Sequence, residues 1–315
     1  MSVVTEKRAA TLERLIATIE AGGLPPWRMP WTPGQGMAHM YPRNGTSGRM
    51  YRGYNRIRLM LEGRSDMRWY TWKQIQAMGS RVRRGEHSTP IEYWQPPSGR
   101  PAATSEDVTE IGAPDAYAGR WLARSYSVFC ADQLEGWVPP ALGDLTEQPL
   151  PIPAELDAWQ AGLVANAGLV IVLADRAAYS PRQDRVMMPD IAAFESIPAW
   201  YATLAHEVVH WSGHADRLDR FAHMGADERA KAIGYAREEL IAEIGSAYIE
   251  AELGLAPSDS AQRASYVSGW LRQCESAHAL AQAAAAAEKA ADWVMLSSGV
   301  SDLEDPITED QAIAS

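Results

Sequence analysis

The chain has 315 residues, enough for two domains that each bury a hydrophobic core, and it lacks the run of about 18 apolar residues that a transmembrane helix needs. Its two cysteines, 144 positions apart, exclude a disulfide framework, and the charged segment Met1–Glu20 lacks the apolar core of a signal peptide, so we expect a cytoplasmic protein with no membrane partner. The net charge of −11 divides into +9 for residues 1–100 and −20 for residues 101–315, which predicts two domains with different partners, the basic one facing nucleic acid.

The first half of the chain predicts a small α+β domain at residues 1–140. Residues 5–21 have the apolar periodicity of an amphipathic helix, and the prolines of residues 25–33 exclude an α-helix from the strap that follows. Residues 124–130 are rich in β-branched and aromatic side chains, which predicts a strand. Residues 95–119 are rich in Pro, Gly, Ala and acidic residues without a period, and we interpret them as a surface insertion.

The basic centre of this domain is residues 43–84, where eleven basic side chains, ten of them arginine, are interleaved with aromatic ones. Arginine binds phosphate and aromatic faces stack on bases, so this composition is typical of a surface that binds single-stranded nucleic acid. A solvated basic face with core aromatics is the alternative. The turn-rich loop 44–48 offers backbone N–H groups to a phosphate. The candidate DNA contacts are Arg43, Arg49, Arg52, Tyr54, Arg56, Trp69, Trp72, Lys73 and Arg84.

A proline-rich linker at 141–153 leads to a second, mostly helical domain at 154–296, and an acidic tail follows at 297–315. Together the two domains predict the α+β class. The elements expected in the second domain are a helix at 154–166, a strand at 169–173, a turn and strand at 179–189, and helices at 200–213, 235–249, 261–275 and 276–296.

The most informative stretch of the second domain is the motif H-E-x-x-H at His206, Glu207 and His210. Helical residues four apart lie on the same face, so both imidazoles can bind one zinc ion, and Glu207 can reach a water at that ion as general base. Ser196 as N-cap and Gly213 as the C-terminal stop frame the helix. A surface helix with two incidental histidines is the alternative, and the helical context disfavours it.

Two histidines leave a zinc ion short of a protein ligand. Glu239 is the favoured third ligand, because a glutamate from a second helix completes the His₂Glu set of catalytic zinc sites. Glu243, one turn further on, is then a candidate to orient a ligating histidine. Asp216 and His214, shortly after the motif, are alternative ligands. Apolar residues also mark a face of the glutamate-bearing helix, so which acid points inward stays open.

Both halves of the chain resemble a known family. The N-terminal half is similar to the single-stranded-DNA-binding domain of ArdC-type antirestriction proteins and of the related plasmid TraC primases. The C-terminal half is similar to the zincin-like metallopeptidase domain that accompanies it. The matching segments are Pro26-Trp27, Pro30-Trp31, Asn44–Asn55, Trp69–Gln74 and Arg84–Glu86 in the first half, and Tyr179–Pro181, His206–His214 and Arg237–Glu243 in the second.

The resemblance implies a protein of conjugative plasmids, phages or related mobile elements, which protects incoming DNA from host restriction and can enter a recipient cell with it. It implies single-stranded DNA as partner, one zinc ion as cofactor, and a protein substrate or restriction enzyme as a further candidate partner. If the second domain hydrolyses peptides, Glu207 is its base, and Tyr235 and His214 are additional donors. The alternative is a non-enzymatic DNA-binding protection module, in which four protein ligands surround a structural zinc ion.

Overall fold

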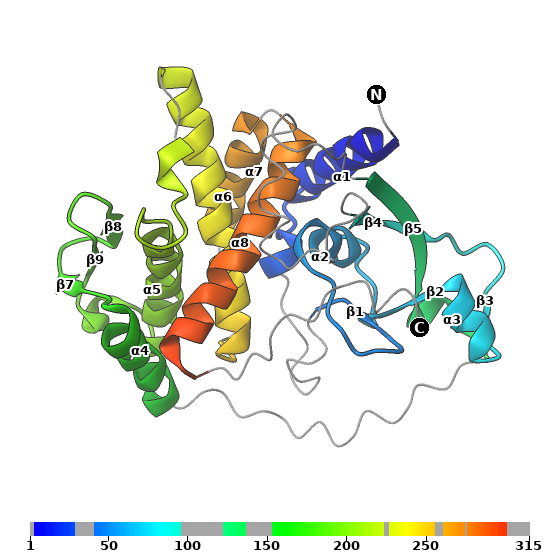
Figure 1. Cartoon of the computed structure of the whole chain (residues 1–315), viewed down its shortest axis with the longest axis horizontal. Helices are drawn as coiled ribbons and strands as arrows, with labels where there is room; N and C mark the ends of the chain where they lie inside the picture. Colours follow the sequence, from blue (N-terminus) through cyan, green and yellow to red (C-terminus); the bar gives the residue numbers. More distant parts are fainter. Residues whose placement is uncertain are drawn as a thin grey trace. The chain divides into compact units, whose positions relative to one another are not determined.

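A computed structural model describes residues 3–28, 41–95, 122–136, 153–223, 227–255, 261–274 and 276–300 (Figure 1). The chain forms two compact units, built from α-helices and three β-sheets within those ranges, which confirms the α+β class with two domains. The predicted insertion, linker and tail lie almost wholly outside the described residues. None of the helices described has both the length and the apolar composition needed to cross a membrane.

The two units do not divide the chain at a single point. One unit comprises Met1–Arg8, Thr32–Gln148 and Glu304–Ser315, and the other comprises Ala9–Trp31 and Pro149–Leu303. An N-terminal segment is thus counted with the second unit, whereas the sequence suggested one domain over residues 1–140. The sequence-based boundaries themselves stay a prediction.

The first unit is centred on a four-stranded sheet with the strand order β1-β2-β5-β4, in which β1 and β2 are parallel and the other neighbours antiparallel. Short helices supply core residues to both faces of this sheet. Leu59 of α2 packs with Trp69, Ile91 and Val128 on one face, whereas Ile75 of α3 packs with residues of the other face. The elements are β1 (Arg43–Asn44), α2 (Gly53–Met60), β2 (Arg68–Thr71), α3 (Trp72–Ala77), β3 (Arg81–Val82), β4 (Thr89–Gln95), β5 (Leu122–Cys130), η3 (Ala131–Gln133) and β6 (Leu134–Glu135).

Local chemistry fixes where α3 begins. The Thr71 hydroxyl accepts a hydrogen bond from the Gln74 amide at 3.4 Å, and Oε1 of Gln74 accepts from the Thr71 amide at 2.8 Å, which forms a capping box. The neighbouring loop packs on the Tyr70 ring so closely that a Cβ at Gly45 would lie 2.0 Å from Cζ of Tyr70. The junction of β2 and α3 therefore presents Trp72 to solvent at a fixed position.

The second unit is a helical bundle with a three-stranded sheet of order β7-β9-β8. Helix α6 packs against α5, α7 and α8, and α4 packs against α8 (Figure 1). A Cβ at Gly245 would lie 3.2 Å from the Ala287 carbonyl oxygen, so small residues set the close approach of α6 and α8. The elements are α1 (Val3–Glu20, with its later residues in this unit), η1 (Pro26–Arg28), α4 (Pro153–Ala167), β7 (Ile171–Leu173), β8 (Ala178–Ser180), β9 (Arg185–Met188), η4 (Ile191–Ala193), α5 (Ile197–Ser212), η5 (Phe221–His223), α6 (Glu228–Glu252), α7 (Ala261–Gln273) and α8 (Ala277–Ser298).

Helix α5 begins and ends where its sequence predicts. The Ser196 hydroxyl accepts a hydrogen bond from the Ala199 amide at 3.2 Å, Pro198 lies in the first turn, and Gly213 is the C-cap. Leu204 and Val208 are fully buried on the inner face of the helix. The H-E-x-x-H motif therefore lies on a helix whose register is set at both ends and by its packing.

Arg28 attaches the N-terminal strap to α6. Its guanidinium is almost fully buried and donates to Oε1 of Glu243 at 2.7 Å, to Oε2 of Glu250 at 2.6 Å and to the Ser246 hydroxyl at 2.9 Å. Burial opposes the charge of Arg28, but Glu250 and Glu243 raise its pKa above the ordinary value. The strap forms a 3-10 turn at this point, and Trp27 beside it is in the core.

We predict that Arg28→Met destabilises the second unit by about 3–5 kcal/mol, because it leaves two carboxylates buried without their cation. Urea unfolding followed by far-UV circular dichroism measures the change. Arg272→Met is the matched control: its ion pair with Glu20 is largely exposed and should contribute less than about 1 kcal/mol. Equal effects of the two substitutions would contradict the prediction.

Candidate functional sites

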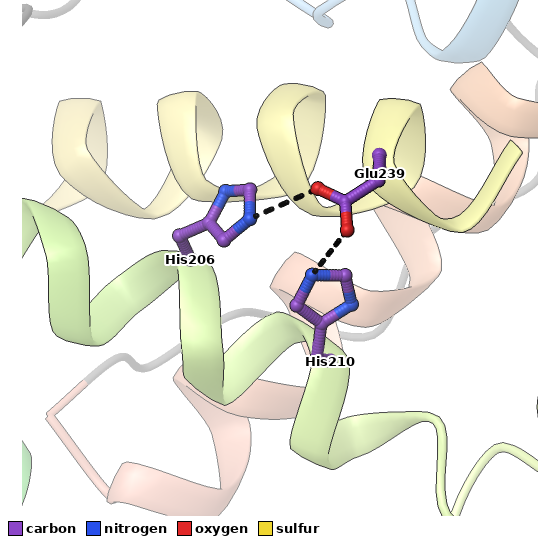
Figure 2. Close-up of side chains that lie close together, drawn as sticks. All are labelled: His206, His210 and Glu239. Atoms are coloured by element: carbon purple, nitrogen blue, oxygen red, sulfur yellow. Dashed lines mark ion pairs between the residues drawn. The ribbon is translucent and has the colours of Figure 1, made fainter. Parts of the chain in front are cut away.

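Helices α5 and α6 bring three metal-ligand side chains together (Figure 2). His206 and His210 point from α5 toward Glu239 of α6, and their ring centroids are 4.9 Å apart. Nε2 of His206 lies 3.6 Å from Oε2 of Glu239, and Nε2 of His210 lies 3.8 Å from Oε1. Over the described residues this is the one group of His, Cys, Asp or Glu in which three ligand atoms all lie within 4.8 Å of one another.

This donor set fits a divalent metal ion. Two imidazole nitrogens and a glutamate are the ligands of the His₂Glu class of catalytic zinc sites. With metal–ligand distances of about 2.0–2.1 Å, tetrahedral ligands lie about 3.4 Å apart. The separations of 3.6 and 3.8 Å between these donors are close to that value.

A second glutamate of α6 sets the orientation of the His210 ring. Oε1 of Glu238 lies 3.3 Å from Nδ1 of His210, so Nδ1 can donate to the carboxylate while Nε2 keeps its lone pair toward Glu239. Burial opposes the protonation of His210, but Glu238 and the neighbouring carboxylates raise its pKa above the ordinary value. Glu238 thus acts on His210 from behind the ligand cluster.

Arg220 in turn holds Glu238. Its Nε donates to Oε2 of Glu238 at 3.1 Å and its Nη2 to Oε1 at 2.8 Å, while Nη1 donates to the Ser212 hydroxyl at 3.0 Å. Burial favours the neutral form of Glu238, yet His210 and Arg220 keep its pKa below the ordinary value. A Cβ at Gly213 would come within 2.8 Å of Nη2 of Arg220, so the glycine that ends α5 also admits this arginine.

Two further groups lie at the cluster. Glu207, in the same turn as His206, is buried, and its charge acts on His210 and on Tyr235. Tyr235, one turn before Glu239 on α6, makes a side-chain hydrogen bond with it. Partial burial and this bond raise the pKa of Tyr235 to about 12, so its hydroxyl keeps its proton at neutral pH.

Known families match both units of this chain. Residues 6–129 match the N-terminal domain of the anti-restriction factor ArdC, and residues 160–287 match a zincin-like metallopeptidase family. The crystal structure of the metal-free antirestriction protein ArdC of plasmid R388 is similar at a TM-score of 0.70 and 35% sequence identity, over 93% of this chain and 97% of that one. The chain belongs to the ArdC-type antirestriction family.

Other relatives extend this family. The Mn(II)-bound structure of the R388 ArdC protein matches at a TM-score of 0.68 and 34% identity, over 94% of this chain and 99% of that one. The uncharacterized protein y4eC of Sinorhizobium fredii is 35% identical and is covered to 89%, as is this chain. A DNA primase TraC of Escherichia coli is 37% identical over 90% of this chain, but the chain spans only 19% of that protein, and 26% of a second TraC.

Within this ArdC-type chain, the remaining metal-site candidates lie elsewhere. Glu243, suggested as the residue that orients a histidine, instead accepts from Arg28, and Glu238 occupies that position behind His210. His214 and Asp216 pair with each other, with Nδ1 and Oδ2 3.4 Å apart, outside the ligand cluster. Glu238 was not identified as a functional residue from the sequence, although it directly precedes Glu239 there.

Three of the predicted DNA contacts are buried. Trp69 is fully enclosed in the core under the sheet, and Tyr54 is buried as well. Arg56 donates from Nε to the Tyr51 carbonyl at 3.0 Å and lies over the Tyr41 ring. The alternative of core aromatics therefore describes Tyr54 and Trp69, and none of the three presents a surface to a ligand.

The remaining DNA candidates keep part of their surface in solvent. Trp72 is 52% exposed and lies 6.0 Å from the Phe129 ring, centroid to centroid, and Lys73 beside it is exposed. Arg84 is also exposed, whereas the other three candidates, Arg43, Arg49 and Arg52, are half-buried. An aromatic face with a neighbouring cation remains available at the start of α3.

The turn-rich loop does not form the phosphate cradle that the sequence suggested. The amides of Thr46 and Ser47 both donate to Oδ1 of Asn44 at 3.0 Å. The Gly45 amide donates to the Trp69 carbonyl, and that of Gly48 to the Asn44 carbonyl. Since the loop uses these N–H groups internally, that expectation is wrong.

We predict that Glu238→Ala weakens the affinity for a divalent metal by about 10- to 100-fold, because His210 loses the acceptor that orients its ring. Isothermal titration calorimetry with zinc, on protein shown to be folded, measures the affinity. Glu228→Ala is the control on the same helix, since Glu228 is exposed in the first turn. Unchanged zinc affinity in Glu238→Ala would refute the positioning role.

Proposed function

We propose that this chain is an antirestriction protein that binds single-stranded DNA through its first unit and hydrolyses peptide bonds through a zinc-dependent second unit. The observation that carries the proposal is the convergence of His206, His210 and Glu239, with Glu207 beside them. In this proposal the protein acts in the cytoplasm, on DNA that enters with a mobile element, and shields that DNA from host restriction.

The donor chemistry and the relatives together support a divalent metal at this cluster. The R388 ArdC protein has a Mn(II)-bound crystal structure. Zinc is our specific assignment, because two neutral imidazoles, which suit zinc, combine here with one carboxylate in the ligand set of catalytic zinc sites. His206, His210 and Glu239 are the proposed ligands.

The residues around the cluster fit the hydrolysis of an amide bond. A bound zinc ion supplies Lewis acidity to the scissile carbonyl and to the attacking water. The Glu207 carboxylate accepts a proton from that water and delivers it to the nitrogen of the leaving amine. The Tyr235 hydroxyl, which keeps its proton, donates a hydrogen bond to the oxygen on which negative charge develops.

The rival assignment is a non-enzymatic protection module with a structural zinc ion. A structural site closes all four positions with protein ligands. Among the described residues the cluster offers three ligands, and His214 and Asp216 pair with each other instead. A structural site needs no general base, so the buried Glu207 carboxylate next to His206 favours the hydrolytic assignment.

The DNA-binding half of the proposal rests on family and surface chemistry. Residues 6–129 match the ArdC N-terminal domain, and the exposed Trp72 with Lys73 offers a stacking face next to a cation. We assign single strands as the ligand, because unpaired bases can stack on an exposed ring without the cost of unstacking a duplex. The TraC primases are far longer than this chain, and we do not extend primase activity to it.

We predict that Glu207→Gln retains zinc at wild-type stoichiometry but loses peptide hydrolysis by at least about 1000-fold, because the amide cannot accept the proton. Mass spectrometry of a proteome-derived peptide library, after incubation with zinc-loaded protein, detects cleavage. Glu195→Gln, an exposed position before α5, is the control and should cleave normally. Undiminished cleavage by zinc-loaded Glu207→Gln would refute the mechanism.

We predict that affinity for labelled oligo(dT) falls with the logarithm of salt concentration at a slope of roughly −3.5, as expected if about five phosphates are neutralised. Trp72→Ala should weaken binding by on the order of tenfold without changing that slope, because stacking is not ionic. Fluorescence anisotropy over a sodium chloride series measures both quantities. Met78→Ala, exposed at the other end of α3, is the control. A salt-independent affinity would contradict the assignment.

A further inference from the structure

In one arginine of the first unit, the Nε atom lacks the hydrogen-bond partner that Nε has in other arginines of this unit. Nε of Arg43 is buried and makes no hydrogen bond, and it is the only arginine atom in that condition among the described residues. By contrast, Nε of Arg8 donates to Glu92 and Nε of Arg56 donates to the Tyr51 carbonyl. Buried polar atoms of charged side chains are normally hydrogen-bonded, so an unpartnered Nε atom favours the binding of an anion.

The neighbours of Arg43 increase this imbalance. Arg43 on the edge strand β1 is in register with Arg68 on β2, and its other backbone neighbour is Met50. Asp66 already neutralises Arg68, with Oδ1 2.9 Å from Nε and Oδ2 2.5 Å from Nη2. Arg43 therefore lies beside a second guanidinium, and Asp66 accepts hydrogen bonds from that second guanidinium.

The direction in which the pKa of Arg43 is shifted agrees with this arrangement of charges. Burial and the nearby Arg68 charge lower the pKa of Arg43, and the attraction of Asp66 only partly offsets them. The same Asp66 raises the pKa of Arg68. The free protein therefore holds Arg43 in a position that costs stability, and a binding anion would remove that cost.

We propose that Arg43, supported by Arg68, is a phosphate-binding subsite that takes one phosphodiester group of a bound single strand. The subsite deepens the proposed function and rests on it for the identity of the ligand. Arginine suits this task because its planar guanidinium donates two parallel hydrogen bonds to phosphate oxygens. One phosphodiester would supply one negative charge to the guanidinium of Arg43.

The position of the subsite suits a strand that also reaches Trp72. Strand β2 begins at Arg68, and Trp72 directly follows its last residue. Four residues of extended chain span roughly 13 Å, which is the approximate distance along β2 between these two positions. A backbone that crosses β1 at Arg43 can therefore place a base near the exposed indole within a few nucleotides. Ionic and stacking contacts would then be made by separate residues.

The test compares wild-type protein with Arg43→Met, which keeps an unbranched apolar side chain and removes the guanidinium charge. Binding of labelled oligo(dT) should weaken by roughly tenfold, and the magnitude of the salt slope should fall by about 0.7, the value for one phosphate contact. Arg272→Met makes the same change in net charge at an exposed ion pair in the other unit, and should leave both quantities unchanged.

A second measurement separates this subsite from a structural arginine. Without ligand, in phosphate-free buffer, Arg43→Met should raise the melting temperature by about 2 °C, because an unpaired charge beside Arg68 is removed. Inorganic phosphate should stabilise the wild type more than Arg43→Met. A lower melting temperature of the variant would assign Arg43 to the structure and overturn the proposal.

The outcomes keep the subsite and the proposed function distinct. If the wild type binds no single-stranded DNA, the proposed function fails. The change in melting temperature on addition of inorganic phosphate then decides alone whether the subsite exists. Stabilisation by phosphate that requires Arg43 then supports a subsite for a free phosphate anion, and an equal response of both proteins overturns it. If the wild type binds DNA and Arg43→Met binds it with unchanged affinity and salt slope, the subsite is overturned while DNA binding stands.

Discussion

The second unit depends on the neutralisation of carboxylates along one helix. Glu238, Glu239, Glu243 and Glu250 all lie on α6 and are largely removed from water, with Glu243 and Glu250 only 2% and 1% exposed. A buried carboxylate without a cation costs several kcal/mol. Two arginines meet most of this requirement, since Arg220 pairs with Glu238 and Arg28 pairs with Glu243 and Glu250. Removal of either arginine would therefore leave a carboxylate of α6 buried without its cation.

This constraint links the fold to the chemistry. Arg220 and Arg28 hold the two ends of the glutamate series, and Glu239 lies between them facing His206 and His210. Since the flanking charges are satisfied by arginine, Glu239 is left as the carboxylate whose natural partner is a metal ion. The first unit shows the opposite case, because Nε of Arg43 is buried without a hydrogen-bond partner while Asp66 binds Arg68.

Local signals in the sequence predicted the local parts of this structure. The helix with H-E-x-x-H, its Ser196 cap and its Gly213 stop follow from neighbouring residues. Helix α3 was missed, although Thr71 and Gln74 form a capping box that can be recognised from their spacing. Arg28 could not be paired with Glu243, because 215 residues separate them and only the fold brings them together.

Composition also could not separate the buried from the exposed aromatic residues. Trp69 and Trp72 have the same chemistry and lie three positions apart, yet one is in the core and the other is half exposed. The strand β2 places alternate side chains on opposite faces, and the turn into α3 then changes the direction of the chain. Their separate roles depend on strand pairing, which a single sequence does not reveal.

The attachment of Arg28 to α6 has a consequence for how such proteins can diversify. Arg28 lies within the segment 6–129 that matches the ArdC N-terminal family, whereas Glu243 and Glu250 lie within the segment 160–287 that matches the zincin-like family. Recombination between relatives at the junction of these segments would separate the arginine from its carboxylates. The two halves can therefore be exchanged between lineages only where this charge pattern is shared.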